Sequence, residues 1–402
     1  MPKSSLALGN LRGFTILMVV AFHSFTAYLG SQPAAQPLFD SPPYSWRANP
    51  ILDSERWFGF DLFCAFEYVH LMQLMFFLSG LFVWPSLLRK GGKKFLYDRF
   101  LRLGVPFVVG LYLLMPAALY PVYRVSAAEP SWAAYWSQWM GLPFWPSGPM
   151  WFLWCLLALN IAAAVLYALA PRAGGFLGRL SAGAGGDPSR FFIALVSVSA
   201  LAYLPVSAVF EPWQWVQFGP FAFQPSLAPL YVIYFFAGVG VGTHGLEHGL
   251  LASDGALAQR WPLWLAGGGA AFLLWIIPTA LIVNGYGVVG LQIVADLGFV
   301  LSSATICFAL MAIFLRFATS RQPLLDSLSE HAYGIYLVHY LFVVWLQYLL
   351  LGAPLFAAAK AAIVFSGTLF LSWATTAAMC RIPIGARVMG GRRRELVRAR
   401  AR

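Results

Sequence analysis

The chain has 402 residues, of which 60% are hydrophobic, 17% aromatic and only 10% charged, and its mean hydropathy is +0.71. Soluble domains carry about 25% charged residues, so this composition excludes a soluble globular protein and indicates a multi-pass membrane protein. The formal net charge of +11 is compatible with nucleic-acid binding or with basic cytoplasmic loops, and its distribution along the chain decides between them.

The apolar residues fall into segments that are close to or above the roughly 20 residues a helix needs to cross a bilayer. Proline, glycine and charged residues separate most of these segments. We therefore expect an all-α, polytopic membrane protein with about ten transmembrane helices. The expected spans are 11–30, 58–87, 103–122, 149–170, 191–210, 226–243, 261–283, 289–315, 329–351 and 355–379.

The basic residues predict the orientation of these spans. If the N-terminus is cytoplasmic, all Lys and Arg residues except Arg47, Arg56, Arg124 and Lys360 lie on the cytoplasmic side. Such asymmetry is typical of membrane proteins. We therefore predict that both termini are cytoplasmic, with a transmembrane domain over 1–380 and a basic tail over 381–402. The tail also suits contact with anionic lipid, and no nucleic-acid partner is needed to explain the charge.

The predicted outer loops, 31–57, 123–148 and 211–225, are rich in Trp, Tyr, Pro and Gln. Aromatic side chains commonly lie at the membrane interface. The same rings also suit stacking on sugars or other ring-bearing acceptors, and both interpretations stay open at the level of the sequence.

Two ionisable residues stand in the first apolar segment. Arg12 and His23 are eleven residues apart, which places them on one helix face, about 16 Å apart along the axis. Arg12 is expected near the cytoplasmic surface and His23 near the middle of the membrane, where ionisable residues usually face a protein-lined or watery cavity. A satisfied core histidine is the alternative. On the functional interpretation, an anion held by Arg12 could extend a thin arm to His23.

A basic cluster over 89–106 follows the second segment. Most of it is explained as a cytoplasmic loop. Arg99 and Arg102, however, stand three residues apart on one expected helix face, where paired guanidinium groups suit phosphate. Asp98 could neutralise one of them.

Further histidines lie in or between the apolar segments. His70 and His339 lie deep in the second and ninth spans, in structural or pocket positions. His244 and His248 are four residues apart but lack a suitable third ligand, so no metal site is expected. The cysteines show no CxxC spacing or His/Cys cluster.

Four stretches of the chain carry further motifs. They are LRGFTILMVVAFHS, FFLSGLFVWPSLLRKGGKKFLYDRFLRLGVP, PMWFLWCLLALN and YGIYLVHY, and they run from residue 11 to residue 340. The first has an arginine, ten residues and a histidine. Together, and in this order, they resemble the acyltransferase family 3 membrane proteins, with their FFxxSG span and RxxR pair, LWFL span and YGIYLVH span.

Within the family, the chain looks closest to the glucans biosynthesis protein C type, which succinylates periplasmic glucans. Many relatives have an Arg-Met pair where this chain has Leu71-Met72, so acetyl and succinyl both stay open as the transferred group.

The resemblance implies an O-acyltransferase of the bacterial inner membrane, with 1–380 as its acyltransferase domain. Acyl-CoA is the co-substrate, no cofactor is permanently bound, and the acceptor is a hydroxyl, often on a carbohydrate. His23 matches the essential histidine, Arg12 the donor-holding arginine, and Arg99 and Arg102 the RxxR pair.

A neutral imidazole can take the proton of the attacking hydroxyl, and an acyl-histidine relay is the alternative. Candidate pocket residues are Ser79, His70, Trp151 and His339. A proton-coupled transporter or exporter is the competing function, because intramembrane His and Arg also suit transport.

Overall fold

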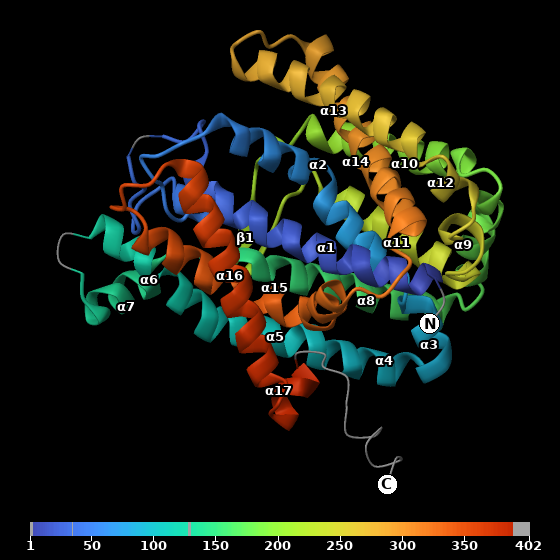
Figure 1. Cartoon of the computed structure of the whole chain (residues 1–402), viewed down its shortest axis with the longest axis horizontal. Coiled ribbons are helices and arrows are strands. Elements are labelled where there is room, and N and C mark those ends of the chain that lie inside the picture. Colours follow the sequence, from blue (N-terminus) through green and yellow to red (C-terminus); the bar gives the residue numbers. More distant parts are fainter. Residues whose placement is uncertain (1–2, 34, 128–129, 389–402) are drawn as a thin grey trace.

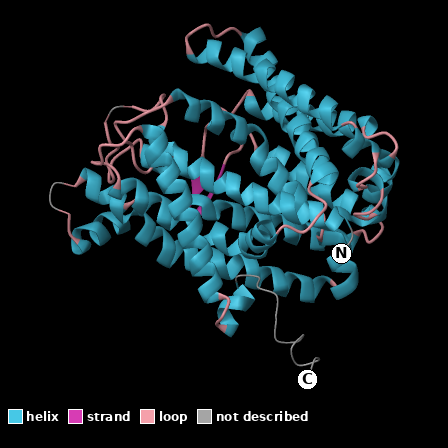
Figure 2. Ribbon diagram, viewed as in Figure 1, coloured by secondary structure: helices cyan, strands magenta, loops and turns pink. Residues whose placement is uncertain are grey.

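The computed structural model describes residues 3–33, 35–127 and 130–388, and this part of the chain is mostly helical (Figures 1 and 2). Nine of its helical segments are long and apolar enough to cross a membrane. A tenth span is formed if Ala228–His244 is counted together with Gly249–Gln259, to which it is bent by 84°. The prediction of a polytopic helical membrane protein with about ten spans is confirmed.

The long helices agree with the predicted spans to within several residues, except in the third span. They are α1 (Lys3–Phe25), α2 (Phe58–Gly80), α8 (Trp151–Leu169), α10 (Ser189–Ser207), α11 (Ala228–His244), α13 (Trp261–Val283), α14 (Val289–Phe317), α15 (Pro323–Leu349) and α16 (Ala357–Met379).

Short elements connect these helices. They are η1 (Thr26–Tyr28), η2 (Ser45–Arg47), α3 (Val83–Lys90), α7 (Trp132–Gly141), η5 (Gly148–Met150), α9 (Ala173–Ala182), η6 (Gly183–Gly185), β1 (Val216–Phe218), β2 (Phe221–Phe223), η7 (Gly249–Leu251), α12 (Ala256–Gln259) and α17 (Pro383–Val388). The strands form one antiparallel hairpin, which the all-helical expectation did not include. Residues 389–402 of the predicted basic tail lie outside the described residues.

The third span is a continuous helical segment over Gly92–Ser126, longer than the predicted 103–122. It consists of α4 (Gly92–Arg99), η3 (Phe100–Gly104), α5 (Val105–Val109), η4 (Gly110–Leu114) and α6 (Met115–Ser126). Both η3 and η4 are π-helical turns. Such turns are rare and often mark functional positions in helices.

Helix α1 lies in the middle of the bundle, where it packs against α2, α14, α15 and α16 (Figure 1). Its contact with α15 is close, since a Cβ at Gly13 would lie 3.5 Å from the backbone nitrogen of Ser329. Helices α2 and α11 are closer still, because a Cβ at Gly238 would clash with the carbonyl oxygen of Phe77, and one at Gly242 with that of Leu81, directly after α2. Small residues allow this approach of backbones between membrane helices.

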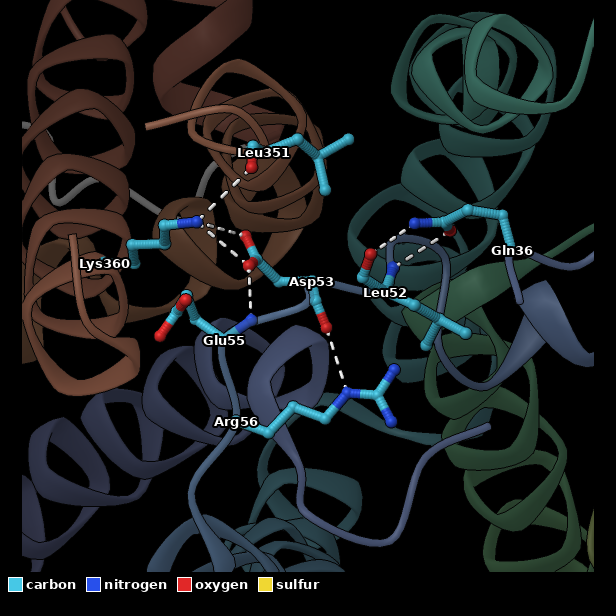
Figure 3. A network of polar contacts seen from close by, with 7 residues as sticks. All are labelled: Gln36, Leu52, Asp53, Glu55, Arg56, Leu351 and Lys360. Carbon is cyan, nitrogen blue, oxygen red and sulfur yellow. Dashed lines mark hydrogen bonds and ion pairs between the residues drawn. The ribbon is translucent and has the colours of Figure 1, made fainter. Parts of the chain in front are cut away.

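The first interhelical loop, residues 31–57, is fixed to the last span by a buried ion pair (Figure 3). Lys360 Nζ lies 2.9 Å from both carboxylate oxygens of Asp53 and 3.4 Å from the carbonyl oxygen of Leu351. Both charged side chains are 1% exposed. Asp53 also accepts a hydrogen bond from the Glu55 backbone, and Arg56 Nε donates to the Asp53 carbonyl. A cation at a span end is thereby compensated by a loop more than 300 positions earlier in the chain.

Candidate functional site

His23 lies near the end of α1, and its ring is held in one orientation. Nδ1 lies 2.8 Å from the Val19 carbonyl oxygen, which can only accept a hydrogen bond. This contact assigns the proton of a neutral ring to Nδ1 and leaves a lone pair on Nε2. Within the described residues, Nε2 makes no hydrogen bond, and His23 is partly exposed. The histidine can therefore accept a proton from a group that reaches it.

His339, on α15, is the nearest ionisable neighbour of His23. It is completely buried, and its Nδ1 donates to the Tyr336 carbonyl oxygen at 2.6 Å. Its Nε2 therefore carries a lone pair, which lies 3.4 Å from His23 Nδ1. The same Nδ1–H of His23 thus faces two acceptors, the Val19 carbonyl and His339.

Other α15 residues complete the surroundings of His23. The Tyr340 ring stands edge-on to the imidazole, with centroids 5.5 Å apart and an interplanar angle of 84°. Gln347 Nε2 donates to the His23 carbonyl oxygen at 2.9 Å. The sequence analysis missed Tyr336, Tyr340 and Gln347. Helical spacing could have found them, because positions 336, 340 and 347 recur on one face beside His339.

Helix α1 is uninterrupted from Lys3 to Phe25, so the expected relation between Arg12 and His23 on one face holds. Arg12 is exposed while its neighbours Leu11 and Gly13 are buried. The Arg12 side chain therefore lies at the surface of the bundle, in the half of α1 that is further from the Lys360–Asp53 pair.

Arg99 and Arg102 lie where α4 passes into the π-helical turn η3. The Arg102 carbonyl accepts a hydrogen bond from the hydroxyl of Tyr333. Tyr333 lies six residues before His339 on α15, about 9 Å along that helix. One helix therefore contacts both the segment that carries Arg102 and the imidazole of His23.

Asp98 does not form a salt bridge with either of these arginines. It is paired with Lys90, whose Nζ lies 2.5 Å from the carboxylate. Among the described residues, Arg99 and Arg102 form no salt bridge, and Arg99 lies over the Phe95 ring at 5.1 Å. Two guanidinium groups without a carboxylate partner can bind an anion.

The other predicted pocket residues are not gathered around His23. The Cys64 thiol lies 3.9 Å from the Phe22 carbonyl, which fixes the register of α1 against α2. His70 then lies about 9 Å, and Ser79 about 22 Å, further along α2 toward the Arg12 end. His70 instead contacts Glu67 and the Phe66 carbonyl.

Trp151, at the start of α8, contacts the rings of Trp215 and Tyr231. Its neighbour Phe152 touches Tyr336, so Trp151 lies at least one side chain removed from the histidine pair. Within residues 3–33, 35–127 and 130–388, no group of three or more His, Cys, Asp and Glu side chains could hold a metal ion.

A comparison with protein families matches residues 6–377 to the family Acyl_transf_3, described as an acyltransferase domain. The chain belongs to acyltransferase family 3. It is therefore a multi-pass membrane enzyme that transfers acyl groups. No curated protein and no solved structure showed a match. The His23–His339 pair and the three arginines all lie within the matched range.

Proposed function

We propose that this family 3 acyltransferase moves an acetyl or succinyl group from cytoplasmic acyl-CoA to a hydroxyl of a carbohydrate-type acceptor on the far side of a bacterial inner membrane. The observation that carries the proposal is His23, a partly exposed imidazole in the interior of the bundle. Its hydrogen bond to Val19 leaves Nε2 ready to accept a proton.

In the proposed reaction, the acceptor oxygen attacks the thioester carbonyl carbon while His23 Nε2 takes the hydroxyl proton. The new C–O bond forms and the C–S bond breaks, with the electron pair leaving on the CoA sulfur. The imidazolium then gives its proton to this thiolate. No oxidant, reductant or metal is needed to balance the step.

Arg12, Arg99 and Arg102 are proposed to bind the phosphates of CoA. Guanidinium groups make strong charge-assisted hydrogen bonds with phosphate oxygens. The separation of about 16 Å between Arg12 and His23 along α1 suits a donor with phosphates at one end and a thioester on a flexible arm.

His339 is proposed as a positioning residue. Its Nε2 lone pair faces His23 Nδ1–H, so the proton of a neutral His23 is held on the nitrogen that points away from the reaction. When His23 becomes protonated, the same lone pair stabilises the Nδ1–H of the imidazolium. Tyr340 restricts rotation of the ring from another side.

The test compares purified wild-type protein with His23→Ala in lipid nanodiscs, using acetyl-CoA and succinyl-CoA. Thioester cleavage should fall about 10²–10⁴-fold in the variant, which is the usual contribution of a general base. His248→Ala is the matched control, since His248 is exposed in the segment between α11 and η7. Folded wild-type protein that neither binds nor cleaves any CoA thioester would overturn the proposal and favour a transporter.

A further inference from the structure

A pocket of about 280 Å³ lies beside the π-helical turn η4, apart from the contacts of His23 described above. Three segments far apart in the chain form it: η4, the end of α7 with the loop after it, and the turn of the β-hairpin. Its lining residues are Leu111, Tyr112, Trp139, Met140, Leu142, Pro143, Phe144, Trp145, Gly219 and Pro220.

Hydrogen bonds hold the walls of this pocket together. Trp145 donates from Nε1 to the Leu111 carbonyl at 3.1 Å and from its backbone N–H to the Gly219 carbonyl at 3.3 Å. Gln217 donates to the Trp145 carbonyl at 2.7 Å and accepts from Arg47 at 3.0 Å. The pocket is thus formed before any ligand binds, which lowers the entropy cost of binding.

A run of contacts connects the pocket wall with the surroundings of His23. Leu111 lies one helical turn before Met115. A Cβ at Gly148 would lie 2.6 Å from the Met115 sulfur and 3.3 Å from the Tyr340 ring. The Tyr340 ring in turn faces His23. Met115 and Tyr340 therefore lie between Leu111 in the pocket wall and the imidazole of His23.

The lining has the chemistry of a site for a sugar ring. The Trp145 ring contacts the rings of both Tyr112 and Trp139, with centroid distances of 5.0 and 5.9 Å. Aromatic faces attract the C–H groups of a pyranose through their negative quadrupole. Tyr112, which is 58% exposed, offers the accessible ring, whereas Trp139 is buried and its indole N–H has no hydrogen-bond partner among the described residues. The pocket volume of about 280 Å³ lies just below the range of about 300–1,000 Å³ for pockets that bind drug-sized ligands, so it suits a smaller group such as one sugar ring.

Exposed apolar side chains surround the mouth of the pocket. Leu113 is 65% exposed, Met140 67% and Phe218 81%. In a chain that spans a membrane, such side chains face lipid. A ligand with an apolar tail can therefore approach the pocket from the bilayer.

We propose that this pocket is the docking site of the acceptor. It binds one sugar ring, and the acceptor carries a lipid tail that stays in the bilayer. The inference rests on the acyl transfer proposed above and narrows its acceptor to membrane-anchored glycosides.

The first test measures binding without turnover. Met140→Cys lies at the rim of the pocket, and Leu273→Cys is exposed on α13, outside the lining. Both variants are labelled with a maleimide in nanodiscs and followed by peptide mass. The n-octyl β-D-glucoside, galactoside and maltoside, each below its micelle concentration, should slow labelling at position 140 several-fold more than at position 273. The methyl glycosides should not. Equal effects at both positions, or none, would overturn the proposal.

The second test measures acyl transfer to the same glycosides. Wild type should acylate at least one octyl glycoside, and Tyr112→Leu should raise the KM for that glycoside about fivefold. Leu273→Ala, on α13, is the control and should leave this KM and acyl-CoA hydrolysis unchanged. If wild type cleaves acyl-CoA but acylates no octyl glycoside, or uses methyl glycosides equally well, the pocket proposal is wrong while the proposed function stands. Loss of CoA cleavage in wild type would instead count against the function itself.

Discussion

His339 Nε2 lies 3.4 Å from His23 Nδ1, so two histidines from opposite ends of the chain meet where α1 packs against α15. Each ring also donates its Nδ1–H to a carbonyl of its own helix. The pair is thus oriented by backbone groups that substitution of neighbouring side chains would leave in place.

Replacement of His339 should separate its positioning role from simple packing. His339→Gln keeps an acceptor that can face His23 Nδ1–H, whereas His339→Phe keeps a ring but no acceptor. We expect kcat to fall about 10–100-fold in His339→Phe, as for other residues that orient a functional histidine. The loss of kcat should be much smaller in His339→Gln, and the KM for acyl-CoA should be unchanged in both variants. Equal losses in both variants would show that His339 only fills space.

The arginines are expected to act on donor binding rather than on the chemical step. Arg102→Gln should raise the KM for acyl-CoA about tenfold or more, because a charge-assisted phosphate contact is lost, and should change kcat little. Lys94→Gln is the matched control, since Lys94 is exposed on the same helix. An equal change in KM for both variants would assign the effect to the general positive charge of this surface.

The Lys360–Asp53 pair should be important for stability. Lys360→Met leaves a buried carboxylate without its cation and is expected to lower the free energy of unfolding by about 3–5 kcal/mol. The double variant Asp53→Leu/Lys360→Met removes both charges and should recover most of this loss. Thermal unfolding of the three proteins in one detergent checks the prediction, and a single variant as stable as wild type would contradict it.

The close contact between α2 and α11 predicts a sharp difference between two glycines. Gly242→Ala places a methyl group against the Leu81 carbonyl oxygen, at the end of α2, which should cost about 1–3 kcal/mol of stability. Gly267→Ala, in α13, meets no atom within 4 Å and should be neutral or slightly stabilising. Measurement of both unfolding midpoints tests whether the helices are packed as closely as described.

Hydropathy predicted the spans well, because a segment that crosses a bilayer must be apolar along its whole length. It predicted the third span less well. The helix there begins at Gly92, within the basic cluster, so charge concealed its first turns. The Val216–Phe223 hairpin was missed because each strand has three residues, too few for an alternating pattern.

The sequence could relate candidate site residues to one another only where they share one helix. His339 was named as a candidate pocket residue, but without its contact with His23. Arg12 and His23 could be related by helical geometry, since α1 carries both. The contacts between His23 and His339 and between Asp53 and Lys360 depend on tertiary packing, because the residues of each pair are more than 300 positions apart in the chain. Local spacing carries no information about such contacts.

The ion pair between loop 31–57 and α16 has a consequence for how the protein is assembled. Asp53 emerges early in synthesis, but its only ion-pair partner in the described part of the chain is in the last long helix. Until α16 inserts, the Asp53 carboxylate has no cation beside it. Until the loop is in place, Lys360 is an unpaired charge at the end of a span. Such a charge costs about 2.5–3.5 kcal/mol at a helix centre and less near the interface. Correct insertion of the final helix is therefore coupled to the folding of the first loop, and a chain that ends before α16 lacks the contact that closes the bundle.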